Sequence, residues 1–293
     1  MVALEFLRAA SKEGIAKFPL SLAHYLETTK HSKVERRKRL ADFMIEISQL
    51  HTIASLEEVL AHEIDASLRV YFGGRIAVKP LHLLGKGVGH ALGTSTSRGF
   101  QVDDSSVLLA PEERQRIEAM ANAMFELGAL AGPDTIGAPD SRNREAQDTI
   151  DDTFVETLRE LPQDVGSLPD NQLIRDVFLV GRCIGDIRVA IESRIAVHGI
   201  SWDEFQSIGP VELMRFVYRM PSRRVDLHLM HQFSKDRNLK RERNDLNDFG
   251  YLGLACAYCD VVVAEKQFTD LVNRGGLEKK AVVISDLREL PNV

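Results

Sequence analysis

Apolar residues recur at helical spacing along most of this chain. The stretch at about 34–48 carries Leu40, Phe43 and Ile47 on one side, and the stretch at about 55–68 opens with a Ser-x-x-Glu capping box. Further helical periods lie at the start of the chain and at about 112–130, 171–198, 202–206, 211–220 and 222–233. The pattern therefore predicts a protein in which helices dominate.

A short strand is predicted near the beginning of the chain. Residues 15–18 form a candidate that Pro19 ends. Ser21 can then cap a helix that carries Glu27. This order, strand then helix, places Glu27 early in the helix.

A β-α-β unit is predicted near the other end. Residues 260–263 and 281–284 are short apolar runs, as expected for buried parallel strands. The helical stretch between them, at about 265–274, ends at a Gly-Gly pair. Parallel strands present their carboxyl ends at one sheet edge, where open α/β sheets build their sites.

One polar segment has no apolar period. Residues 131–148, AGPDTIGAPDSRNREAQD, combine glycine, proline and polar side chains. This composition predicts a mobile loop or lid near 131–150.

Acidic side chains bracket the apolar stretch NDLNDFGYLGLACAYCDVVVAEKQF, residues 244–268. Asp245 and Asp248 are three apart at a predicted helix start, so they share one face. Glu265 follows the strand at 260–263, and Glu27 follows the other strand candidate. Carboxylates that converge at one edge repel each other unless a cation is present, and magnesium prefers such oxygen ligands. A purely structural alternative stays open, in which these acids only cap helices or interact favourably with the helix dipole in the first turn.

Composition and charge narrow the possible functions. The 293 residues carry a formal charge of −6, so any binding of nucleic acid must use a local basic patch. Three cysteines are too few for a disulfide framework, and Cys256 and Cys259 are expected to pack rather than bind zinc. No apolar run approaches the ~20 residues that span a membrane. We expect a cytoplasmic protein without a membrane anchor.

Basic residues cluster near both groups of acids. Arg36 to Arg39 follow Glu27, and the arginines before the acidic helix include Arg223, Arg224 and Arg237. These side chains either form a solvated face or bind phosphate groups through guanidinium forks.

The acidic stretches resemble PIN-domain (PIN-like) metal-dependent ribonucleases. The resemblance rests on FPLSLAHYLET, which contains Glu27, and on NDLNDFGYLGLACAYCDVVVAEKQF. It covers roughly residues 1–70 and 220–293, and residues 71–219 look like a mainly helical insertion. The family implies an α/β fold with a parallel sheet flanked by helices, and acids that bind Mg²⁺ or Mn²⁺ to cut RNA.

The resemblance also implies roles for single residues. Glu27 matches the second acid of the family, Asp248 with Asp245 the third, and Glu265 the fourth. The family's first strand and its aspartate have no counterpart, since the chain starts inside a helical pattern, and we expect an upstream segment. Ala264 and Glu265 stand where the family more often has Thr or Ser followed by Asp.

Three functions remain open at this point. The first is RNA hydrolysis with catalytic Glu27, Asp248 and Glu265, metal ligands that include Asp245, and Arg223, Arg224 and Arg237 as substrate contacts. The second is a PIN-like module that binds RNA or protein without cutting, which the missing first acid favours. The third is a helical interaction protein. A protein regulator or a homo-oligomer is compatible with each of them.

Overall fold

The computed structural model describes residues 2–29, 31–93, 110–132, 141–236, 239, 241 and 245–292. For residues 2, 141–151, 245–248 and 292 it describes the backbone without the side chains. The chain divides into two compact units, unit 1 (Met1–Ser55 and His82–Asp140) and unit 2 (Leu56–Leu81 and Ser141–Val293). Each unit has its own hydrophobic core.

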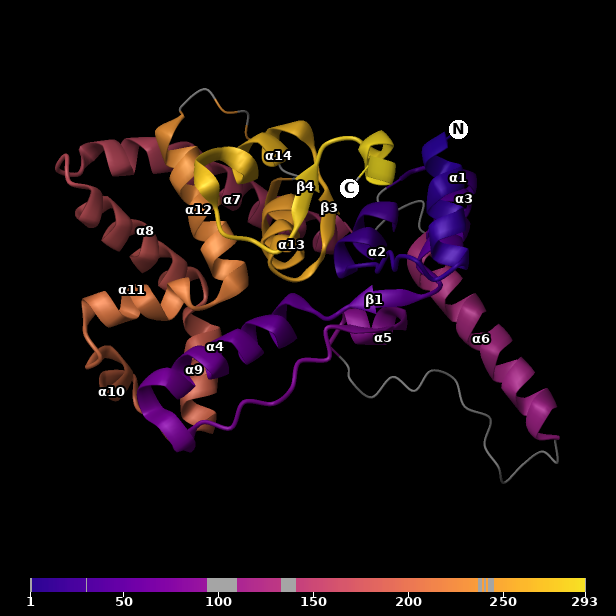
Figure 1. The fold of residues 1–293 in the computed structure, drawn as a ribbon, viewed down its shortest axis with the longest axis horizontal. Helices are drawn as coiled ribbons and strands as arrows, with labels where there is room; N and C mark the ends of the chain where they lie inside the picture. Colours follow the sequence, from indigo (N-terminus) through magenta and orange to yellow (C-terminus); the bar gives the residue numbers. More distant parts are fainter. Residues whose placement is uncertain are drawn as a thin grey trace. The chain divides into compact units, whose positions relative to one another are not determined.

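Helices dominate both units, as the apolar periods predict (Figure 1). Unit 1 contains α1 (Val2–Lys12), α2 (Leu22–Thr29), α3 (Val34–Ser48), β1 (His51–Ile53), β2 (Leu84–Lys86), α5 (Gly87–Ala91) and α6 (Pro111–Ala131). Unit 2 contains α4 (Leu56–Phe72), η1 (Gly73–Arg75), α7 (Ser141–Ser167), α8 (Gln172–Asp186), α9 (Arg188–Val197), α10 (Trp202–Gln206), α11 (Pro210–Tyr218), α12 (Pro221–Lys235), α13 (Asp245–Tyr258), β3 (Val261–Val263), α14 (Lys266–Asn273), η2 (Arg274–Gly276), β4 (Val282–Ile284) and η3 (Leu287–Asn292).

Strands are few and short. Within the described residues they form two two-stranded sheets, β1 with β2 and β3 with β4. The predicted α-rich α/β class is therefore confirmed in its coarse form. A larger parallel sheet is not found in the described part of the chain.

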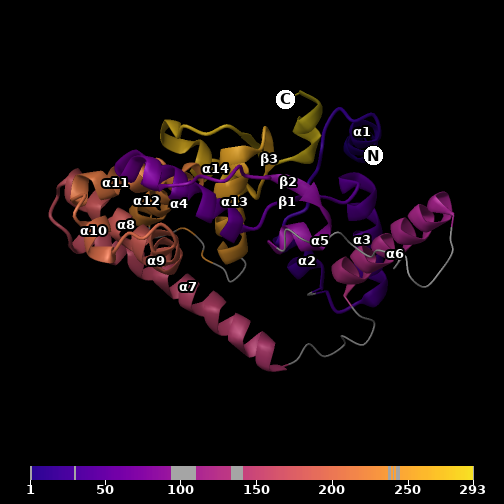
Figure 2. The same cartoon turned by 90° about the horizontal axis from the view of Figure 1, so that it is seen from below.

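Unit 1 is built around the pair α3 and α6, which lie side by side (Figures 1 and 2). Tyr25 of α2, Ala41 of α3 and Leu130 of α6 are buried together in its core. The phenol of Tyr25 donates a hydrogen bond to Glu126 Oε2 at 3.1 Å, and the amide of Val88 donates to Glu126 Oε1 at 2.8 Å. A buried carboxylate thus links α2, α5 and α6.

The predicted strand at residues 15–18 is wrong. Ile15 is 72% exposed and lies in a bend, and residues 16–18 have no regular secondary structure. The paired residue is Leu20, after Pro19, which forms a parallel bridge to Thr52 of β1. An apolar run becomes a strand only where a partner offers backbone groups, and here the partner reaches Leu20 alone.

Unit 2 is organised around α12, which packs against α7, α8, α13 and α14. The ring of Phe233 lies 6.2 Å from that of Phe249 and 6.2 Å from that of Phe268, measured between centroids. These three rings join α12, α13 and α14 in one core.

The predicted β-α-β unit is confirmed. β3 and β4 pair in parallel, with Val262 opposite Val283, and α14 connects them (Figure 1). Phe268, Leu271 and Val272 of α14 are buried, while Gly275 has a φ of 76° in the turn after the helix. The left-handed backbone there explains a glycine at this position.

Two other predictions need correction. Residues 141–148, predicted as part of a loop, begin the long helix α7 (Figure 2), because Arg, Glu, Ala and Gln favour a helix without any apolar stripe. Residues 133–140 lie outside the described part. The helix predicted at 171–198 breaks at Ile187, whose φ and ψ of −105° and 12° separate α8 from α9, two residues after Gly185.

The compact units divide the chain differently from the predicted domains, which joined 1–70 with 220–293. Residues 1–55 cluster with 82–140, whereas 220–293 cluster with α4 and with the helices of 141–219. The helices assigned to an insertion therefore share one core with the β-α-β unit. Among the described residues, no helix has the length and apolarity needed to cross a membrane.

Candidate functional site

Glu265 stands where β3 ends and α14 begins. The amide of Ala264 donates to the carbonyl of Ile284 at 3.0 Å, and the amide of Thr269 donates to the carbonyl of Glu265 at 2.9 Å, which fixes the turn. Glu265 occupies the N-cap position of α14, but its side chain makes no capping bond and is exposed. Its carboxylate is thus available at the carboxyl end of a parallel strand, as predicted.

Asp245 and Asp248 lie in the first turn of α13, which begins at Asp245. Their predicted place at a helix start is confirmed for the backbone, while their side chains lie outside the described atoms. Carboxylate oxygens are the donors that Mg²⁺ and Mn²⁺ prefer, so the chemistry of Asp245, Asp248 and Glu265 fits such an ion. No cluster of three or more potential ligands is found among the described side chains, which do not include those of Asp245 and Asp248.

Glu27 lies in the second turn of α2 and is half-buried. It belongs to unit 1, whereas Asp248 and Glu265 belong to unit 2. The grouping of the three carboxylates in one site stays a prediction.

The arginines predicted to bind substrate differ in their surroundings. Arg223 pairs with Asp226 at 2.8 Å, and its side chain is only 17% exposed. Arg224 pairs with the exposed Glu278 at 2.5 Å, so its partner can be displaced. Arg237 lies outside the described residues.

The sequence pattern missed a buried polar network in unit 2. Glu63 of α4 accepts hydrogen bonds from the amide and hydroxyl of Ser222, at 2.9 and 2.6 Å, and from the phenol of Tyr258 at 2.8 Å. Ser222 is the second residue of α12, so Glu63 satisfies a free amide at that helix start. The available signal was spacing, because Glu63 falls on the same helical face as Val59 and Leu60.

Asp226 extends this network beside Arg223. Its Oδ1 atom is buried and has no hydrogen-bond partner among the described groups. A Cβ atom on Gly253 would lie 2.2 Å from that oxygen, so the glycine is required for the close approach of α12 and α13. Burial raises the pKa of Asp226 to about 7; Arg223 opposes this shift, and Glu63 and Asp186 add to it.

Replacing Asp226 by asparagine should remove a pH dependence of stability. The folded chain holds a proton up to about pH 7 that the unfolded chain releases near 3.8, so the wild type loses stability as the pH rises between these values. Between pH 5 and pH 7 the free energy of unfolding, measured with urea, should fall by about 1–3 kcal/mol more in the wild type than in Asp226→Asn. Parallel pH profiles of the two proteins would contradict this expectation.

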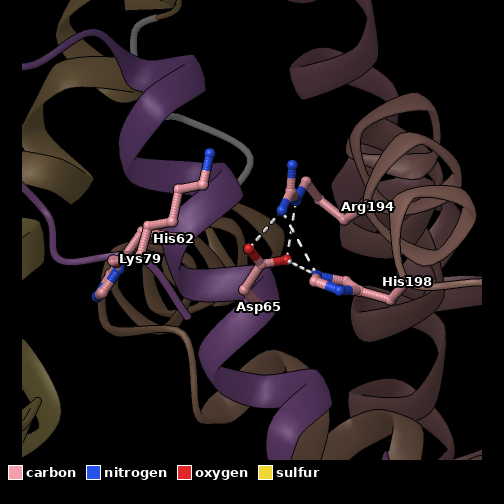
Figure 3. A network of polar contacts seen from close by, with 5 residues as sticks. All are labelled: His62, Asp65, Lys79, Arg194 and His198. Carbon is pink, nitrogen blue, oxygen red and sulfur yellow. Dashed lines mark hydrogen bonds and ion pairs between the residues drawn. The ribbon is translucent and has the colours of Figure 1, made fainter. Parts of the chain in front are cut away.

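A second buried cluster surrounds Asp65 of α4 (Figure 3). Arg194 donates to both carboxylate oxygens, Nε to Oδ1 at 2.8 Å and Nη2 to Oδ2 at 2.5 Å, and His198 Nε2 donates to Oδ1 at 2.9 Å. The side chains of Asp65 and His198 are 5% and 6% exposed. Figure 3 shows both partners turned toward the carboxylate, while His62 bonds to the carbonyl of Lys79 on another side of α4. The cluster fastens α9 to α4, and its groups are occupied by one another.

Comparison with known proteins adds no family to these observations. No protein-family model matches the chain, and no curated protein and no solved structure matches it significantly.

Proposed function

We propose that this chain hydrolyses RNA phosphodiester bonds as a PIN-like, Mg²⁺- or Mn²⁺-dependent ribonuclease. The observation that supports the proposal most is Glu265, an exposed carboxylate at the end of a parallel strand that is not used to cap its helix. Asp245 and Asp248 at the start of α13 supply the further acids of the same unit.

In this proposal the carboxylates of Asp245, Asp248 and Glu265 hold the ion. Such an ion neutralises phosphate charge and activates water for in-line attack. Arg224 is suited to orient the phosphate, because the exposed Glu278 can exchange for a substrate oxygen. Glu27 as a further ligand stays a prediction, which Glu27→Gln tests separately.

The test is cleavage of a labelled single-stranded RNA with Mg²⁺, with Mn²⁺ and with a chelator. Cleavage should require the ion and should be lost in Asp248→Asn and Glu265→Gln, since each change removes a charged ligand. Asp270→Asn is the matched control, because it removes an exposed carboxylate from helix α14, five residues after its N-cap Glu265.

Binding of Mn²⁺, followed by the loss of its free electron paramagnetic resonance signal, separates the ion site from turnover. Mn²⁺ binding that survives Asp248→Asn and Glu265→Gln together, or cleavage that a chelator leaves unchanged, would refute the proposal. RNA binding without any cleavage would instead support the non-catalytic PIN-like module.

A further inference from the structure

An open hollow lies beside the start of α3 in unit 1. It has a volume of about 480 Å³ and is lined by Lys33, Val34, Glu35, Arg36 and Arg39. Lys33 is the N-cap residue of α3, and its side chain makes no capping bond. The hollow therefore combines the positive end of a helix with three cationic side chains.

The three cations are not neutralised by the described part of the protein. No ion pair among the described residues involves Lys33, Arg36 or Arg39, whereas Arg8 in the same unit pairs with Glu46 at 2.7 Å. The single acid at the hollow, Glu35, leaves an excess of two positive charges. In a chain with a net charge of −6, this local excess is where a polyanion would be attracted.

Arg37 stands in the same basic run but has a different role. It is 1% exposed, and it donates to the carbonyl of Ala131 at 2.6 Å and to the carbonyl of His31 at 2.8 Å. These bonds fix the first turn of α3 against α6. The structure thus divides the run Arg36 to Arg39 into a buried anchor and exposed cations that the anchor holds in place.

The spacing of the exposed cations indicates an extended ligand. Arg36 and Arg39 lie three residues apart in α3, so they share one side of the helix with about 4.5 Å of rise between them, and Lys33 precedes them at the N-cap. A row of charges suits a chain of phosphates better than a single anion. Guanidinium forks pair bidentately with phosphate oxygens, which favours phosphate as the group that is bound.

We propose that Lys33, Arg36 and Arg39 form a binding site for the phosphate backbone of single-stranded RNA. The choice of RNA rests on the proposed function. The site itself rests on the hollow and on its three cations, which form no ion pair within the described part of the chain.

The test measures the binding of a fluorescent 20-nucleotide oligouridine by anisotropy, in chelator so that nothing is cut. Arg36→Ala/Arg39→Ala should lower the slope of log affinity against log salt by about 1.4, since each phosphate contact contributes about 0.7 for single strands. At 0.1 M salt this corresponds to roughly 25-fold weaker binding.

The matched control is Lys12→Ala/Lys17→Ala, which removes two exposed charges of unit 1 outside the hollow. An unchanged slope in the double arginine variant, or an equal change in the control, would overturn the proposal. Competition by polyglutamate as strong as that by RNA, at equal charge, would overturn the choice of nucleic acid.

The RNA-binding site and the ribonuclease proposal can fail independently of each other. If cleavage is lost in Asp248→Asn and the salt slope is unchanged in Arg36→Ala/Arg39→Ala, the RNA-binding site at the hollow is wrong and the ribonuclease proposal is supported. If the wild type shows no metal-dependent cleavage but Arg36→Ala/Arg39→Ala lowers the salt slope, the RNA-binding site is supported and the ribonuclease proposal is wrong.

Discussion

Replacing Asp65 by alanine is expected to lower the free energy of unfolding of unit 2 by about 3–5 kcal/mol. The change leaves the guanidinium of Arg194 and the buried imidazole of His198 without their shared acceptor; the side chain of His198 is 6% exposed and that of Arg194 22%. Removing one partner of a buried ion pair costs this much because the remaining charge stays desolvated.

Urea unfolding followed by tryptophan fluorescence measures this effect, because the single tryptophan, Trp202, lies in α10 of unit 2. Glu192→Ala is the matched control, since it breaks an exposed pair with Arg188 on the same helix α9 and should cost at most about 1 kcal/mol. A loss for Asp65→Ala no larger than that of the control would contradict the structural role of the cluster.

Replacing Glu63 by alanine should cost at least about 3 kcal/mol. Three donors lose their acceptor, the amide and hydroxyl of Ser222 and the phenol of Tyr258, and each buried unsatisfied group costs about 1–3 kcal/mol. Glu63→Gln keeps the shape and one acceptor oxygen, so it should cost clearly less.

An independent readout is the alkaline titration of Tyr258. Burial first, and then the charge of Glu63 and the hydrogen bond to it, raise the pKa of this phenol. Ultraviolet absorption should therefore show a lower pKa for Tyr258 in Glu63→Ala than in the wild type. Equal stability of the alanine and glutamine variants, with an unchanged tyrosine titration, would exclude Glu63 as the cap of α12.

The elements that the sequence predicted well are those whose determinants are local. α3 spans Val34–Ser48 and α10 spans Trp202–Gln206, as their apolar periods predict, and Asn171 caps α8 through bonds to Leu173 and Ile174. The β-α-β unit was also found, because both strands and their crossover helix lie within 30 residues of chain.

The errors arise where a distant partner decides the outcome. Residues 15–18 have the composition of a strand, but only Leu20 meets β1. Glu63 of α4 is a charged residue at a buried position, and its partners Ser222 and Tyr258 lie on α12 and α13. Periodicity identifies the helical face of such a residue but not the donor or acceptor opposite it.

For the residues of the candidate site, too, the sequence predicts positions that depend on local order but not those that depend on a distant partner. The location of Glu265 at the end of a parallel strand followed from the local order of strand and helix. The inward orientation of Arg37 could not follow from sequence, because its acceptor Ala131 is 94 residues away. A run of four basic residues therefore concealed one structural residue among the exposed ones.

The arrangement of α4 also has a consequence for synthesis on the ribosome. Glu63 precedes Ser222 by 159 residues and Tyr258 by 195, and Asp65 precedes Arg194 by 129. At about 5–20 residues per second, translation needs roughly 10–40 s to proceed from Glu63 to Tyr258. During this interval the nascent chain exposes Ile64 and Leu68, which are fully buried in the finished unit. The time for which a chaperone can bind α4 is therefore set by the speed of translation.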